Sequence, residues 1–132
     1  MAALDTNVLV RFLVQDDAAQ GQAATRLIRD TVEAGRRLFV PVTVLLALEW
    51  VLRSAFGFDK VAVLKTLFRM LGSFELMFES ESAVEIALAQ YQASTADFAD
   101  CLHAALAGQA GEQPLWTFDK AAAKAGGAQM LA

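Results

Sequence analysis

Four aspartates lie where they could act together on one substrate. Asp97 and Asp100 are three residues apart on an expected helix, so their side chains project within about 60° of each other. Asp5 and Asp119 each follow a short apolar run that we expect to form a strand. Like charges at the spacing of Asp97 and Asp100 repel, and no lysine or arginine between Glu85 and Lys120 compensates them. A hard divalent cation such as Mg²⁺ or Mn²⁺ would offset the repulsion and could support phosphoryl transfer.

Each aspartate also has a simpler interpretation. Asp5 and Asp97 precede expected helices, where an aspartate is a favourable N-cap. Asp119 follows a strand and is typical of a turn. Asp100 is harder to explain in this way, because it lies inside a helix beside apolar residues. The coincidence of all four is therefore a stronger indication of a site than any one of them.

The elements that must position these residues alternate between short apolar runs and longer segments of helical period. We expect strands at 2–4, 38–40, 74–78 and 115–118, an edge strand at 128–131, and helices at 8–14, 17–35, 43–57, 59–71, 80–91 and 97–107. This alternation predicts an α/β fold of three layers, with a mainly parallel central sheet of four to five strands flanked by helices. Ligands of such sheets bind beyond the carboxyl ends of the strands, where Asp5 and Asp119 lie.

Length and composition predict a single globular domain over residues 1–132. The chain is 56% hydrophobic and 20% charged, and its net charge of −4 argues against a general basic surface for nucleic acid. Cys101 is the only cysteine, and no apolar stretch approaches the roughly 20 residues that span a bilayer. We expect a cytoplasmic protein without a membrane partner. A mean hydropathy of +0.40 leaves apolar surface for a homodimer.

Three segments together resemble a known family. The run from Leu4 to Leu9, the run from Asp97 to Asp100, and the run from Thr117 to Asp119 are similar to the motifs of PIN domains. Within that family the chain most resembles the VapC-type toxins of type II toxin-antitoxin systems. The similarity covers essentially the whole chain and the order of its elements.

The resemblance implies a PIN-like fold and a metal-dependent endoribonuclease that uses Mg²⁺ or Mn²⁺. It further implies an RNA substrate, a homodimer, and inhibition by a cognate VapB-type antitoxin. The matched positions assign Asp5, Asp100 and Asp119 as catalytic metal-site residues, Asp97 as a further catalytic acid, and Thr6, Asn7 and Thr117 as neighbours that orient the site.

One position departs from the family pattern. Similar family members usually carry a glutamate three residues before the tryptophan that is Trp50 here, and this chain has Ala47. Glu49 should point about 200° away from Ala47 and pair with Arg53 on the helix surface. We therefore predict an incomplete site and a weakened or inactive nuclease, whether Ala47 is natural or engineered. The alternative is a non-catalytic PIN-fold protein that acts by binding antitoxin or RNA.

Overall fold

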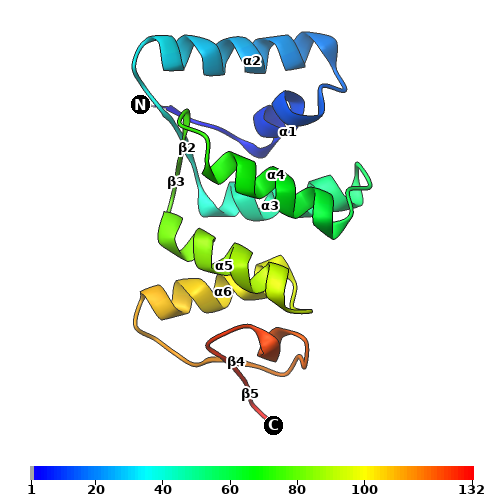
Figure 1. The fold of residues 1–132 in the computed structure, drawn as a ribbon, viewed down its shortest axis with the longest axis vertical. Coiled ribbons are helices and arrows are strands. Elements are labelled where there is room, and N and C mark those ends of the chain that lie inside the picture. The colour runs from blue at the N-terminus through cyan, green and yellow to red at the C-terminus, as the bar shows by residue number, and fades with distance from the viewer. Residues whose placement is uncertain (1) are drawn as a thin grey trace. The chain divides into compact units, whose positions relative to one another are not determined.

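The computed structural model describes residues 2–132, which form two compact units (Figure 1). The first unit extends to Glu79 and the second covers Ser80–Ala132. Both contain short parallel strands and helices, so the expected mixed α/β fold class is confirmed. The five strands pair as a group of three and a group of two. None of the described helices is long and apolar enough to cross a membrane.

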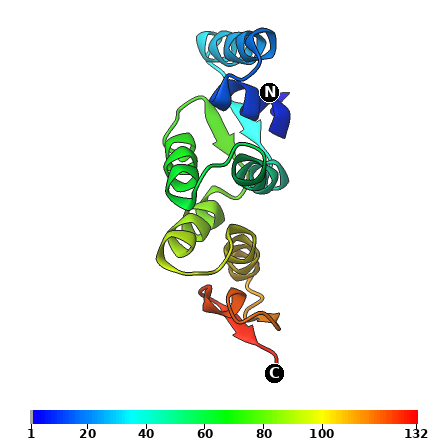
Figure 2. The ribbon, with the colours of Figure 1, turned by 90° about the vertical axis from the view of Figure 1, so that its right-hand side faces the viewer.

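The first unit contains a three-stranded parallel sheet and four helices. Its elements are β1 (Ala2–Ala3), α1 (Thr6–Val14), α2 (Ala18–Glu33), β2 (Leu38–Val40), α3 (Val42–Ser54), α4 (Lys60–Leu71) and β3 (Leu76–Phe78). The strands lie in the order β1-β2-β3, and the arrows of β2 and β3 lie side by side in Figure 2. Phe39 at the centre of β2 pairs with Ala3 of β1 and with Met77 of β3.

The second unit pairs two helices and two strands. Its elements are α5 (Glu81–Ala93), α6 (Phe98–Gln109), β4 (Leu115–Thr117), the short 3-10 helix η1 (Ala122–Lys124) and β5 (Ala128–Met130). Tyr91 of α5 and Phe98 of α6 are both buried, and their ring centroids are 5.7 Å apart. The edge strand expected near the carboxyl end is present as β5, which runs parallel to β4.

Aspartate caps begin two of the helices, and the sequence predicts the one at Asp17. The carboxylate of Asp17 accepts a hydrogen bond from the backbone N–H of Gln20 at 2.9 Å, and that of Asp59 accepts one from Ala62 at 2.8 Å. From its residue type Thr43 is predicted to cap α3, but this prediction is wrong, because that helix begins at Val42. A side chain distant in sequence caps it instead, since Glu79 Oε1 accepts from the Val42 N–H at 2.7 Å.

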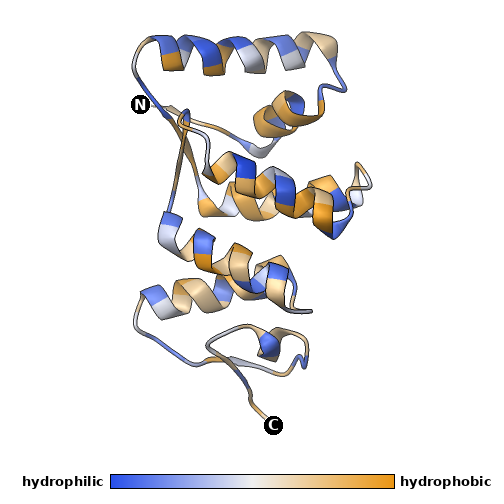
Figure 3. Ribbon diagram, in the orientation of Figure 1, coloured by the Kyte–Doolittle hydropathy of each residue, from blue (hydrophilic) through white to orange (hydrophobic). Residues whose placement is uncertain are grey.

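Helix α4 presents a different face to the core from the one expected. The helical period of residues 59–71 predicts a core face of Val61, Leu64, Leu67 and Phe68, but Val61 and Phe68 are 74% and 41% exposed. Val63 and Met70 are buried in their place, together with Leu64 and Leu67, which were predicted correctly. Hydrophilic and hydrophobic residues alternate along α2 (Figure 3).

The rotational setting of α3 is the largest difference from expectation. Its buried positions are Leu45, Leu48, Glu49 and Leu52, which follow helical spacing along one face. Glu49 is only 2% exposed, so its expected place on the surface is wrong. Its expected pairing with Arg53 is confirmed, because Arg53 Nη2 donates to Glu49 Oε1 at 3.1 Å and Nε donates to Oε2.

The same rotational setting of α3 exposes two residues that lie close to Glu49 in the sequence. Ala47 is exposed, and Trp50, which follows Glu49, is 61% exposed. A long side chain at position 47 would therefore meet solvent rather than the core.

Candidate functional site

Asp5 connects the first strand to the first helix. The backbone N–H of Leu4 donates to the carbonyl oxygen of Phe39 at 2.9 Å, which holds the chain beside β2 up to this point. Asp5 then occupies the N-cap of α1, and its Oδ1 accepts a hydrogen bond from the Thr6 N–H at 2.7 Å. The cap interpretation is thus confirmed. It engages one carboxylate oxygen and leaves the second for another ligand.

The neighbours of Asp5 lie on the first turn of α1. Thr6 is the first helical residue and is half-buried, whereas the Asn7 side chain is exposed. Both are therefore held within two residues of the carboxylate by a helix whose positive N-terminal end favours negative charge there.

Asp97 and Asp100 lie at the start of α6. Asp97 is the N-cap residue, with extended backbone, but its carboxylate makes no capping hydrogen bond. Asp100 is half-buried in the first turn, and its pKa is raised above the ordinary value of 3.8. Burial is the largest cause, followed by the negative charges of Asp97 and Asp119. His103 and a hydrogen bond to the Asp97 backbone lower it in part.

Asp119 lies just beyond β4 in a tight turn. Thr117 Oγ1 accepts a hydrogen bond from the Asp119 N–H at 3.0 Å, and Asp119 Oδ1 accepts one from the Ala121 N–H at 2.8 Å. The turn interpretation of Asp119 is therefore confirmed. Because these local hydrogen bonds fix the backbone on both sides, the exposed carboxylate has a defined direction at the end of the strand.

The second unit therefore brings three of the four candidate aspartates into electrostatic contact. The negative charges of Asp97 and Asp119 add to the effect of burial in raising the pKa of the Asp100 carboxyl. No lysine or arginine occurs between Arg69 and Lys120. Between these two residues His103 is the only basic side chain, and it partly offsets the negative charge near Asp100, while Lys120 directly follows Asp119.

The acidic cluster has the donor chemistry that a hard divalent cation requires. Carboxylate oxygens are the preferred ligands of Mg²⁺ and Mn²⁺, and a cation would offset the mutual repulsion. Within residues 2–132, no three histidine, cysteine, aspartate or glutamate side chains are already close enough to hold one ion together. The residues fit such a cation by chemistry and charge.

Two further positions complete the inventory of the site. Ala47, at the position where the resemblance implies a glutamate, is exposed in the middle of α3. Asn7 lines a cavity between α1 and α2. No sequence pattern indicated this cavity, because its walls come from two helices that meet only in the folded chain. The nearest sequence signal was the alternation of polar and apolar residues along α2.

Comparison with known proteins gives one match. Residues 2–128 match the PIN domain family, a span that includes residues of both compact units. No curated protein and no solved structure matches the chain.

Proposed function

The chain belongs to the PIN domain family, and from this premise we propose that it is an endoribonuclease toxin that hydrolyses RNA phosphodiesters with Mg²⁺ or Mn²⁺. PIN domains are generally nucleases that use divalent metals. The proposed toxin is inhibited by a cognate VapB-type antitoxin and is weakened by Ala47. We also propose a homodimer, which the exposed apolar side chains of Val61 and Phe68 on one face of α4 support.

The observation that carries this proposal is the acidic cluster of the second unit. A half-buried carboxyl whose pKa is raised by burial first, and then by two neighbouring carboxylates, is costly for a protein that makes no use of it. A cluster of carboxylates repels a negatively charged phosphodiester. It therefore suits a nuclease only when bound cations neutralise the carboxylates. The net charge of −4 is compatible with this function, because the cations supply the positive charge.

The roles of the residues follow from their local surroundings. Asp5, Asp100 and Asp119 are the proposed metal-site residues, and Asp97 is a further catalytic acid. The bound cation would lower the pKa of a water molecule and stabilise the leaving oxygen. Asp97 carries a carboxylate that makes no capping bond, so it can accept a hydrogen bond from the attacking water.

Backbone contacts orient two of these carboxylates. Thr117 Oγ1 accepts a hydrogen bond from the Asp119 N–H, and the Thr6 N–H donates to one oxygen of Asp5, with Asn7 next on the same turn of α1. Loss of these neighbours should disturb geometry rather than charge.

A second function is supported by Ala47. A methyl group supplies no metal ligand, so the chain would act as a non-catalytic PIN-fold protein that binds antitoxin or RNA. We propose that the antitoxin lays an amphipathic segment against the first helices and α3, with a basic side chain near the acidic residues. A crosslinking map in which the antitoxin contacts only surfaces away from the first helices and α3 would contradict this placement.

Cleavage of RNA by matched variants at position 47 distinguishes the two functions. The unmodified chain, Ala47→Glu and Ala47→Gln are incubated with total RNA and transfer RNA, with Mg²⁺ or Mn²⁺ and with EDTA. Because position 47 is exposed, both substitutions should fold, and glutamine matches glutamate in size but lacks its charge. We expect strong cleavage only by Ala47→Glu, its loss in EDTA, and a rate at least about 100-fold lower after adding Asp100→Asn. If no folded, antitoxin-free variant cleaves RNA, the binding function is supported instead.

A further inference from the structure

A cavity of about 320 Å³ lies between α1 and α2 of the first unit. Val8 and Leu27 contribute apolar walls together with two alanines of α2. The polar lining consists of Asn7, Arg11 and Gln20. A mainly apolar cavity with a few placed polar groups is typical of a site for a small planar or apolar group.

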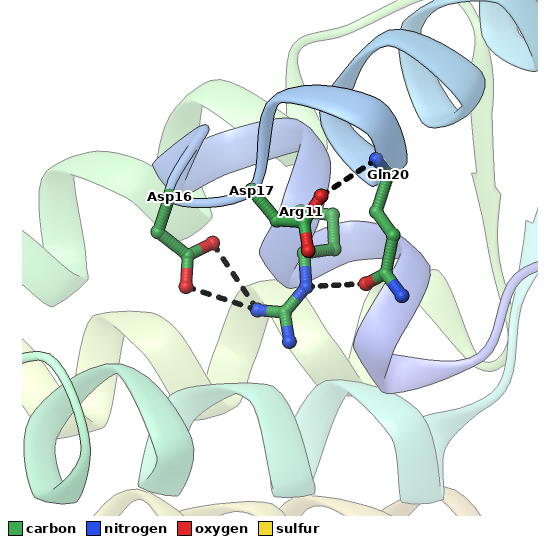
Figure 4. Close-up of polar contacts among 4 residues, drawn as sticks. All are labelled: Arg11, Asp16, Asp17 and Gln20. Atoms are coloured by element: carbon green, nitrogen blue, oxygen red, sulfur yellow. Dashed lines mark hydrogen bonds and ion pairs between the residues drawn. The ribbon is translucent and has the colours of Figure 1, made fainter.

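The positive charge beside this cavity is neutralised within the protein (Figure 4). Arg11 Nη1 donates to both carboxylate oxygens of Asp16 at 3.1 Å. Arg11 Nε donates to Gln20 Oε1 at 2.6 Å. The guanidinium is thus fixed in one position, and its charge is shared with a carboxylate. These contacts disfavour a phosphate as the occupant of the cavity and favour an uncharged group.

The hydrogen bond between Arg11 and Gln20 determines which atoms of Gln20 can bind a ligand. Its Oε1 is engaged by Arg11, and its backbone N–H is engaged by Asp17, so the amide Nε2 is the group that remains to donate (Figure 4). Asn7 adds a second amide to the lining of the cavity. An uncharged planar ring with acceptor atoms on its edge matches apolar walls and amide donors, and nucleobases are such rings.

The position of the cavity connects it with the proposed nuclease site. Asn7 lines the cavity and is two residues from Asp5, on the first turn of the same helix. An RNA strand with a phosphate near Asp5 therefore has a neighbouring base within reach of the cavity. Resting on the proposed function, we infer that this cavity binds one base beside the cleaved phosphodiester, and that Gln20 Nε2 donates to an acceptor on that base.

Replacing Gln20 by glutamate tests this inference without removing the partner of Arg11. Gln20→Glu keeps an acceptor for Arg11 Nε but exchanges the donating amide nitrogen for an oxygen. Gln22→Glu is the matched control, because it adds the same charge two residues away on α2 at an exposed position outside the lining of this cavity. Equal unfolding temperatures of the two variants would show that neither disturbs the fold.

Binding is measured by fluorescence anisotropy in EDTA, with short labelled RNA oligonucleotides that differ at one base. We expect the unmodified protein and Gln22→Glu to share a preference of about 2- to 12-fold at one position, the effect of one hydrogen bond. Gln20→Glu should abolish or reverse it. If the preference is unchanged in Gln20→Glu, the cavity inference is overturned and the cavity suits another occupant, such as an apolar side chain of the antitoxin. If the unmodified protein binds no RNA, the proposed function fails together with this inference.

Discussion

Replacing Arg53 by methionine should destabilise the first unit, because Glu49 would lose its bidentate partner inside the protein. Glu49 is 2% exposed, whereas the Arg53 side chain is 38% exposed. Breaking a fully buried pair costs about 3–5 kcal/mol, and an exposed pair contributes at most about 1 kcal/mol. With one partner buried and the other partly solvated, we expect a loss of about 2 kcal/mol.

The double variant Glu49→Leu/Arg53→Met is the control for this magnitude. It leaves no buried charge, and leucine continues the apolar face of Leu45, Leu48 and Leu52. Its free energy of unfolding should lie within about 1 kcal/mol of the unmodified protein. The single variant Glu49→Leu completes the double-mutant cycle, from which we expect a coupling energy of about 1–2 kcal/mol.

Urea unfolding followed by the fluorescence of Trp50 measures the effect on the helix concerned. Trp50 lies on α3, and Trp116→Phe in every variant removes the other tryptophan. With a slope of about 2 kcal/mol per molar urea, the expected loss lowers the midpoint by about 1 M. A shift below about 0.2 M for Arg53→Met would refute the conclusion that the pair fixes α3 with Glu49 inside and Ala47 outside.

Two other substitutions test local contacts. Glu79→Ala removes the acceptor for the Val42 N–H and should lower the free energy of unfolding by about 1 kcal/mol, measured in urea, with Glu79→Gln losing less. Burial, followed by the charges of Asp97 and Asp119, raises the pKa of Asp100. The stability that Asp100 contributes is therefore fully present below the ordinary carboxyl pKa and is lost as the pH rises through the raised pKa. In EDTA, Asp100→Asn should therefore lose less stability between about pH 4 and pH 7 and gain roughly 0.2–0.5 kcal/mol at neutral pH. An unchanged pH dependence would contradict the cause assigned to the shift.

Local signals made much of the fold predictable from the sequence. The aspartate caps of α2 and α4 satisfy backbone groups within three residues, so they can be recognised without the rest of the chain. The short strands were predicted from apolar runs bounded by polar residues. The caps and turns of Asp5 and Asp119 were also predicted, since each uses backbone N–H groups one or two residues away.

The setting of α3 could not be predicted in the same way. Nearly every residue from Val42 to Leu52 is apolar, so helical spacing is satisfied by the face of Val44, Leu48 and Val51 as well as by the face that is buried. A glutamate in such a helix is normally assigned to the surface. Here the Arg53 side chain, itself partly exposed, allows the carboxylate to be buried.

Contacts between residues far apart in the chain could not be predicted from the sequence either. The cap that Glu79 provides for α3 joins residues 37 positions apart, and no local pattern indicates it. The cavity beside Asn7 likewise depends on how α1 packs against α2. The raised pKa of Asp100 was foreseeable only in part, because its largest cause is burial.

Binding of Mn²⁺ by the unmodified chain is the most direct test of whether the acidic cluster is a metal site. Isothermal titration compares it with Asp100→Asn and with Glu85→Gln, which removes one exposed negative charge from the same unit. We predict binding by the unmodified protein and by Glu85→Gln, and affinity at least about 10-fold weaker in Asp100→Asn. Equal affinity in all three proteins, or no binding in any of them, would contradict the proposal that Asp97, Asp100 and Asp119 serve a divalent cation.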